Sequence, residues 1–219
     1  MSAAPLPCAS SGTFANLVAL GPDGCEIGNL VFSGFTYRAT ASEGDTPLPS
    51  TSFAYDVVDV GNQIGFNFSA ASLTASTGEI FDVHIDYTVT SPQATIISDH
   101  MEMTGFALVA GTVSATETFC KDHSYSGCPT GQSDTISTYD IPSIPMTLKI
   151  ANATFSAVSI LGIDKDINVN GGSGGYATMS GLLETVDQTT TTPEPTTLLS
   201  LGSGLMLLCW FGRRKIAAK

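Results

Sequence analysis

Acidic and imidazole side chains alternate along one short segment of the chain. In the stretch FDVHIDYTV, Asp82, His84 and Asp86 occupy every second position. A β-strand directs such residues to one face, where mixed imidazole and carboxylate ligands could hold a divalent metal. Because the same alternation describes any solvated strand face, the pattern favours a polar surface over a metal centre. For His100 and Glu102, which share a face only if their segment is extended, a polar edge is again favoured.

A second pattern matches the first half of a calcium-binding loop. Asp166, Asn168, Asn170 and Gly171 fit the sequence D-x-N-x-N-G, in which oxygen ligands at alternate positions surround a hard cation. Ala177 stands where a bidentate glutamate would close the site. The segment therefore favours an exposed strand that ends in a turn. Asp166, Asn168 and Asn170 remain the calcium candidates of the sequence, and we expect no bound metal and no cofactor.

The sequence contains none of the common motifs of hydrolytic or phosphate-binding enzymes. It has no G-x-S-x-G nucleophile turn, no phosphate-binding Gly-Lys loop and no H-E-x-x-H metal motif. A glycosidase needs two carboxylates about 5 to 9 Å apart in a cleft. The 20 acidic residues offer too many pairs to choose between. We therefore expect that the protein is not an enzyme.

The five cysteines fall into two local pairs and one single residue. Cys8 lies near Cys25, Cys120 lies near Cys128, and Cys209 lies within an apolar segment. In an oxidising compartment each pair can close a loop and stabilise the fold by about 2 to 4 kcal/mol. The spacing suits structural zinc poorly. We predict two disulfides, with free thiols as the alternative.

Charge is distributed very unevenly along the chain. Four of the eight basic residues are Arg213, Arg214, Lys215 and Lys219, within the last seven positions. Residues 1–212 hold the other four and all 20 acidic residues, a formal charge of −16. Nucleic-acid binding requires Lys and Arg to displace counterions from phosphates. The acidic body therefore disfavours a nucleic-acid partner.

The C-terminal part has the composition of a membrane anchor. The 17 residues from Thr196 to Gly212 carry no charge, and as a helix they would measure about 25 Å, close to the thickness of a bilayer core. The basic residues that follow favour the cytoplasmic side, which places the body outside. Residues 187–195, DQTTTTPEP, favour an extended linker. We predict one C-terminal transmembrane helix; a buried helix of the domain is the alternative.

The order of these parts resembles a known sorting signal. Pro193, Glu194 and Pro195 are followed by the apolar run and then by the basic tip of Arg213, Arg214 and Lys215. This resembles the PEP-CTERM sorting signal of Gram-negative bacteria over about the last 27 residues. The resemblance implies processing near Pro-Glu-Pro by a membrane transpeptidase of the exosortase type. It also implies export to the cell surface or an exopolysaccharide matrix.

Two segments of the body are also similar to β-rich domains of such anchored proteins. They are residues 8–32, which contain the first cysteine pair, and residues 165–172, KDINVNGG. Export would require an N-terminal leader, whereas the chain starts with MSAAPLPCASSG. Because Ser2, Ala3 and Ala4 look like the small-residue end of a signal peptide, we hypothesise that Met1 is a misassigned or engineered start.

Short alternating segments separated by Gly, Pro, Asn and Asp predict an all-β body. We expect an antiparallel β-sandwich or jelly-roll-like domain over residues 1–186, the linker over 187–195, and the anchor with its basic tip over 196–219. The expected strands are Thr13–Leu20, Asn29–Tyr37, Ser52–Val60, Gln63–Ala70, Phe81–Val89, Ala94–Ser98, Gly105–Phe119, Pro145–Ile150, Ser156–Ile163 and Tyr176–Val186.

Together these features predict an exported, non-enzymatic protein of the surface or matrix. Its expected partners are the membrane, an exosortase-type enzyme and exopolysaccharide. The alternative is a carbohydrate-binding module, which would turn aromatic rings outward along a groove. An ice-binding protein would need a flat, regular array of Thr, but outside the linker the Thr residues are scattered. The aromatic candidates for a groove are Phe53, Tyr55, Phe66, Phe68 and Tyr139.

Overall fold

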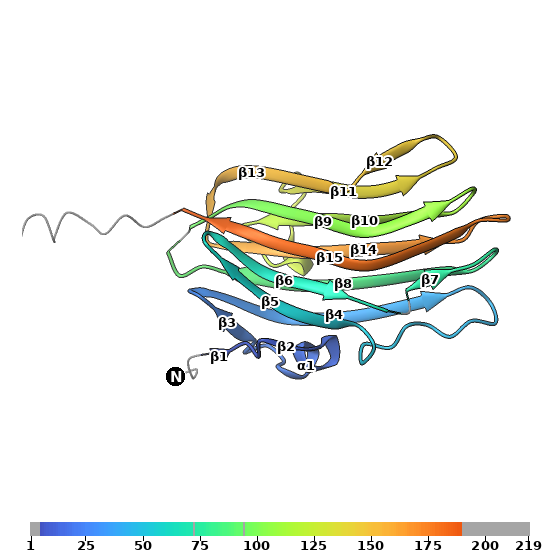
Figure 1. The fold of residues 1–219 in the computed structure, drawn as a ribbon. Helices are drawn as coiled ribbons and strands as arrows, with labels where there is room; N and C mark the ends of the chain where they lie inside the picture. The colour runs from blue at the N-terminus through green and yellow to red at the C-terminus, as the bar shows by residue number, and fades with distance from the viewer. Residues whose placement is uncertain (1–4, 72, 94, 190–219) are drawn as a thin grey trace, which may run out of the picture. The chain divides into compact units, whose positions relative to one another are not determined.

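Two β-sheets stack face to face in a computed structural model that describes residues 5–71, 73–93 and 95–189 (Figure 1). The all-β prediction is confirmed for these residues. Only the β1–β3 pair is parallel among the strand pairs of this part of the chain. The eight-stranded sheet contains, in order, β1 (Leu6–Pro7), β3 (Cys25–Ile27), β4 (Leu30–Ala41), β8 (Ile80–Thr90), β14 (Ile160–Asn170), β10 (Thr112–Lys121), β11 (Ser133–Ile141) and β12 (Met146–Leu148).

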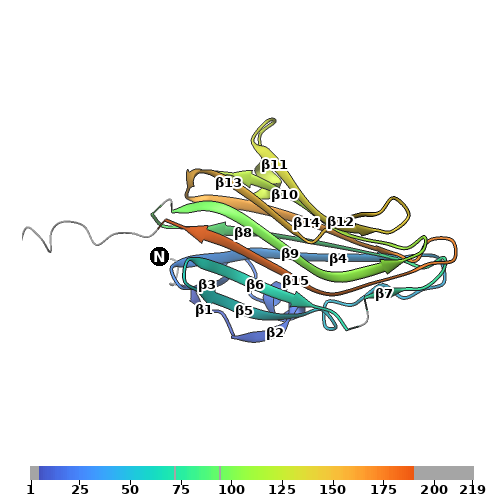
Figure 2. The same cartoon turned by 45° about the horizontal axis from the view of Figure 1, so that its top comes forward.

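The second sheet has seven strands and lies over the first, with the long strands of both layers running lengthwise beside one another (Figure 2). Its short strand β7 (Thr74–Ala75) pairs with β15 beside the main path. The main path contains, in order, β13 (Ile150–Val158), β9 (Ile96–Leu108), β15 (Tyr176–Gln188), β6 (Gln63–Ser69), β5 (Ala54–Val60) and β2 (Ser11–Thr13).

Strand alternation fills the space between the sheets. Along β8, Val83, Ile85, Tyr87 and Val89 are buried, whereas the residues between them are half-buried on the outer face. This is the division that period two predicts for a sheet with one packed face. Around Phe66 the core is mainly aromatic. Phe66 lies at its centre, with ring centroids 5.0 to 6.4 Å from those of Phe32, Phe35, Tyr55, Phe68 and Tyr87.

One predicted strand is a helix. Thr13–Leu20 was expected to be extended, but α1 spans Phe14–Ala19. Thr13 and Asn16 form a capping box, in which the Thr13 backbone N–H donates to Asn16 Oδ1 at 2.8 Å. The helix buries Phe14 and Leu17, and six residues are too few for period 3.6 to stand out from period two.

Another predicted strand divides in two. Gly105–Phe119 was expected to be continuous, but β9 ends at Leu108 and β10 starts at Thr112. Val109 adopts φ 59°, and the Gly111 N–H donates to the Leu108 carbonyl at 2.9 Å, which closes a turn. Strand β11 was not predicted at all, because the sequence SDTISTYDI alternates only weakly.

Both predicted disulfides are present. Cys8 and Cys25 have a Cα separation of 4.8 Å and tie the N-terminal segment to β3. Cys120 and Cys128 have a Cα separation of 5.7 Å and tie the end of β10 to the 3₁₀-helix η1 (Tyr125–Gly127).

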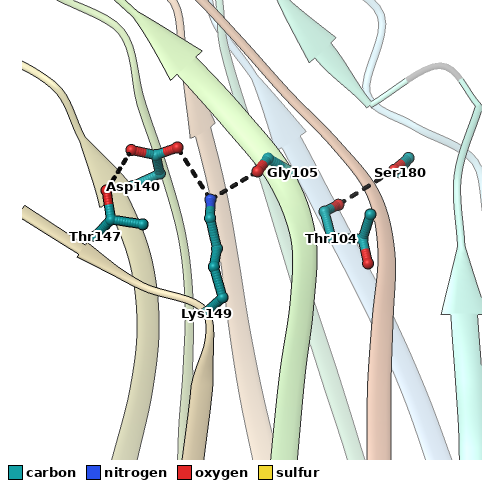
Figure 3. Close-up of polar contacts among 6 residues, drawn as sticks. All are labelled: Thr104, Gly105, Asp140, Thr147, Lys149 and Ser180. Atoms are coloured by element: carbon teal, nitrogen blue, oxygen red, sulfur yellow. Dashed lines mark hydrogen bonds and ion pairs between the residues drawn. The ribbon is translucent and has the colours of Figure 1, made fainter.

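Lys149 joins the two sheets at the β12–β13 connection (Figure 3). Its ammonium donates to the Gly105 carbonyl of β9 at 2.6 Å and to Asp140 Oδ2 of β11 at 3.0 Å. Burial by itself would raise the pKa of Asp140, but hydrogen bonds from Lys149 and Thr147 hold this pKa below its usual value. The Asp140 carboxylate is thus charged and fixed in place.

The predicted C-terminal parts fall mainly outside the described residues. Strand β15 continues through Gln188, two residues into the segment that the sequence predicts as linker. The Pro-Glu-Pro motif, the apolar run and the basic tip all lie beyond residue 189. Within the part of the chain that is described, none of the helices has both the length and the apolar character needed to cross a membrane.

Candidate functional site

Four aspartates and one histidine gather on the outer face of the eight-stranded sheet. Asp82, His84 and Asp86 project from β8, and Asp164 and Asp166 project from the neighbouring strand β14. The register pairs His84 with Asp166 and Asp86 with Asp164. Alternation turns these residues outward on both strands, so pairing doubles the density of carboxylates. We call these five residues the acidic face.

His84 lies between two of the carboxylates. Its Nε2 atom is 3.4 Å from Asp82 Oδ2 and 3.9 Å from Asp166 Oδ1. Ligand atoms of these three residues all lie within 4.8 Å of one another, which is a geometry able to hold a cation. The sequence pattern had placed Asp86 in this group. Cross-strand pairing brings in Asp166 instead, and Asp86 accepts a hydrogen bond from Thr36 Oγ1 at 2.5 Å.

The carboxylates of the acidic face influence one another's protonation. Burial raises the pKa of Asp164 to about 6, with further increases from its hydrogen bond to Asp86 and from the charge of Asp86. The pKa of Asp166 is also raised, first by burial and then by the hydrogen bond and charge of Asp82. The pairs Asp86–Asp164 and Asp82–Asp166 therefore each favour a shared proton, or a cation in the place of that proton.

A hollow of about 430 Å³ adjoins the acidic face. Tyr125 of η1, which is 36% exposed, forms part of its rim. The η1 loop can approach the sheet because residue 162 is glycine: a Cβ there would lie 2.1 Å from the Tyr125 backbone nitrogen. The disulfide at Cys128 holds the other end of the loop. The hollow is lined by Thr36, Tyr37, Arg38, His84, Asp86, Tyr125 and Asp164.

The residues of the calcium pattern do not form a loop. Asp166, Asn168 and Asn170 all belong to β14, which pairs with β8 on one side and β10 on the other. Alternate residues of a strand lie about 6.6 Å apart, so three such positions cannot surround one ion. Asn170 Oδ1 instead accepts the Gly172 N–H at 2.7 Å and closes the following turn.

The second histidine candidate lies on the other sheet. His100 and Glu102 are half-buried residues of β9, which is extended at both positions. His100 Nδ1 lies 2.5 Å from Oδ1 of Asn152, its register partner on β13. The two residues are polar, as the sequence favoured, but they lie on an inner strand and not at an edge, because β9 pairs with β13 on one side and β15 on the other.

The aromatic residues considered for a glycan groove lie inside the protein. Phe53, Tyr55, Phe66 and Phe68 are each at most 2% exposed, and their rings pack against one another. These four therefore do not line an outward groove: Tyr55, Phe66 and Phe68 are turned inward by their strands, and Phe53 lies just before β5. Tyr139 of β11 is half-buried.

Several residues of the hollow were missed from the sequence. Asp164 lies two positions before Asp166 in the stretch DKDINVN and so on the same face of the strand, which means that strand alternation could have identified it. Arg38 reaches the hollow because β4 pairs with β8 and sets it opposite His84. Tyr125 gives no such indication, since a disulfide-closed loop has no periodic pattern.

Comparison with known proteins finds one sequence match. Residues 191–215 match the PEP-CTERM protein-sorting motif, and this range includes Pro193–Pro195 and Arg213–Lys215. A search of curated proteins gives no match.

Solved structures with some similarity include several β-rich proteins. One is TmCBM61 in complex with β-1,4-galactotriose, which is 11% identical over 68% of this chain and 86% of that one, with a TM-score of 0.31. Another is a family 11 carbohydrate-binding module from Clostridium thermocellum, 11% identical over 72% and 89%, with a TM-score of 0.26. A third is endoglucanase 3 of Trichoderma harzianum, 9% identical over 69% and 98%, with a TM-score of 0.25. Scores this low carry no conclusion about ligands.

Proposed function

We propose that this chain, which carries a PEP-CTERM sorting motif, is an exported, non-enzymatic protein of the cell surface or extracellular matrix. The motif match at residues 191–215 is the observation that carries the proposal. In this proposal the apolar run holds the chain in the cytoplasmic membrane of a Gram-negative cell. An exosortase-type enzyme then cleaves near Pro195 and transfers the β domain outward, to the surface or an exopolysaccharide matrix.

Two properties of the body support export. Disulfides persist in oxidising compartments and are rare in the cytosol, and this domain has two of them. Residues 1–212 also carry a formal charge of −16, which favours a soluble domain that does not adhere to nucleic acid. Both properties suit a protein that remains outside the cell.

The acidic face supports binding more than catalysis. Carboxylate oxygens of Asp82 and Asp166 lie 3.4 and 3.9 Å from His84 Nε2, and they can hold a proton or a cation in place. A carbohydrate-binding role is the second candidate, and the observation that favours it is the hollow beside this face. Arg38, His84 and two aspartates there offer hydrogen bonds to sugar hydroxyls, and Tyr125 offers an exposed ring.

Cell fractionation tests the sorting proposal. The full chain, expressed behind a secretory leader in an exosortase-containing host, should be found outside the cytoplasm and be digested by external protease. Replacement of Arg213, Arg214 and Lys215 by Glu should abolish correct orientation and cleavage, since the basic tip is the retention signal. Deletion of residues 196–219 should instead release a soluble domain. A wild-type chain found only in the cytoplasm despite its leader would refute the proposal, as would unchanged processing in a strain without exosortase.

A further inference from the structure

Four ionisable side chains lie in the core between the two sheets. Lys165 of β14 and Glu117 of β10 come from the eight-stranded sheet, and Asp99 of β9 and Glu184 of β15 come from the other. The exposed fraction is 2% for Glu184 and 0% for the other three. Each occupies an inward position of its strand, where alternation would place an apolar residue.

The lysine is in contact with two of the three carboxyl groups. Glu117 is its direct register partner on the neighbouring strand, and Lys165 Nζ contacts Glu117 Oε2. On the other side, Nζ lies 2.7 Å from Glu184 Oε2. Within the described part of the chain, neither carboxyl oxygen of the fully buried Asp99 has a hydrogen-bond partner. A carboxyl oxygen of Asp99 lies within 4.8 Å of one from Glu117, so this buried acid is adjacent to the Lys165–Glu117 pair.

Full ionisation of these four groups would leave a net charge of −2 in an apolar core, which is strongly unfavourable. Burial, followed by the charges of Glu117 and Glu184, raises the pKa of Asp99 well above its usual value. Burial also raises the pKa of Glu184 to about 8, with a further contribution from Glu117. Although burial opposes it, the Lys165 charge lowers the pKa of Glu117. At neutral pH the cluster therefore holds an ammonium, a carboxylate and two carboxylic acids.

We propose that Lys165 and Glu117 condense within the folded protein to form an amide cross-link, with Asp99 as the group that transfers the protons. Three features of the cluster favour this reaction. The amine and the carboxyl carbon are held together by direct strand pairing, and such preorganisation can correspond to effective molarities on the order of 10⁵ to 10⁸ M. The core lacks the bulk water that would reverse the reaction. Condensation also replaces a buried ion pair with a neutral amide.

The step balances without an oxidant or any other reactant. A proton moves from Lys165 Nζ to Glu117 Oε2, which gives a neutral amine beside a neutral carboxyl group. The nitrogen lone pair attacks Glu117 Cδ and forms the C–N bond. Asp99 gives its proton to the departing hydroxyl oxygen as the C–O bond breaks, and it recovers a proton from the nitrogen. The products are one amide and one water molecule, and Asp99 is regenerated.

A divalent cation held by the three carboxyl groups is the competing use of this cluster, since their ligand atoms lie within 4.8 Å of one another. The ammonium of Lys165 contacts Glu117 and Glu184 and supplies the positive charge that a metal would otherwise provide. The arrangement therefore favours the lysine reaction over a metal site.

Intact mass spectrometry of the full chain, denatured and with both disulfides reduced, tests the proposal. The expected mass is lower than that of the sequence by one water molecule. Proteolysis should then give a branched peptide in which Lys165 is joined to Glu117. An unmodified mass for the folded wild-type chain would overturn the proposal. A branch that joins Lys165 to Glu184 would overturn the choice of Glu117.

Variants test the roles of the residues. The Lys165→Met and Glu117→Met variants should both have the mass that their sequences give. The Lys121→Met variant, which alters a partly exposed lysine, should still be lighter than its sequence by one water molecule. Asp99→Asn should fold, as judged by circular dichroism, but cross-link at least tenfold more slowly. An Asp99→Asn chain that cross-links at the wild-type rate would refute the role of Asp99. If any variant fails to fold, the mass of the wild-type chain still decides whether the bond exists.

Discussion

Replacing Phe66 with alanine separates a core role for the aromatic residues from a ligand-binding role. Phe66 is 0% exposed and its ring lies within 6.4 Å of five other aromatic rings, measured between centroids. Loss of the buried ring surface costs about 2 to 3 kcal/mol. An unfilled space of roughly 80 Å³ adds about 2 kcal/mol. We therefore expect Phe66→Ala to lower the free energy of unfolding by about 4 kcal/mol.

Urea denaturation followed by fluorescence or circular dichroism measures this loss as a shift in midpoint at unchanged slope. Phe106→Ala is the matched control, because Phe106 is 47% exposed and contacts Tyr176 at a ring-centroid distance of 5.9 Å. Its loss should be below about 1 kcal/mol. If Phe66→Ala keeps the wild-type midpoint but weakens binding of a polysaccharide, then Phe66 lies on a binding surface and the core described here is wrong.

Three further perturbations have expected outcomes of their own. Replacing Cys120 and Cys128 together by Ala should lower the free energy of unfolding by about 2.5 kcal/mol, because the unfolded chain regains the entropy of a small loop. Calorimetry under oxidising conditions measures the change. Under reducing conditions, which open both disulfides of the wild type, the difference between the two proteins should disappear. Burial raises the pKa of Asp164 from its usual 3.8 to about 6, so the folded state binds this proton more tightly than the unfolded chain does. The carboxyl therefore lowers stability as the pH rises through this range. Asp164→Asn should thus stabilise the protein above pH 6 and lose this advantage on acidification, and a pH-independent effect in thermal melts would contradict the shared-proton interpretation. Lys149→Met removes the hydrogen bonds to Asp140 of β11 and to the Gly105 carbonyl of β9. Because Lys149 is partly exposed, the free energy of unfolding in urea should fall by only about 1 kcal/mol. An unchanged midpoint would show that Lys149 does not stabilise the sheets.

Alternation of apolar and polar residues predicts the strands well where one face of the sheet is buried. From Asp82 to Val89 the inward and outward positions of β8 could be assigned in advance, because burial on one side makes period two clear. The failures have local causes. Helix α1 is too short to show its own period, and the turn at Val109 requires a backbone conformation that a β-branched residue rarely adopts.

The acidic face could be predicted only strand by strand. The sequence places Asp82 and His84 on one face of their segment, but their neighbour Asp166 lies about 80 positions away. The pairing of β8 with β14 decides which carboxylates meet, and this pairing depends on the topology of the whole sheet. A local pattern therefore identifies candidates for a site, whereas partners from other strands complete it.

The buried charged cluster shows that strand alternation can also predict the position of a buried charge. Lys165 lies between Ile163 and Ile167 on the inward side of β14, and Glu117 has the same relation to its neighbours on β10. A charged residue at an inward position is unfavourable unless an opposite charge meets it in the core. A single lysine that breaks such a pattern therefore implies an acidic partner at an inward position of another strand, even before the register is known. Since the sequence offers several acids of this kind, the pattern predicts that a buried partner exists, and only the pairing of β10 with β14 identifies it as Glu117.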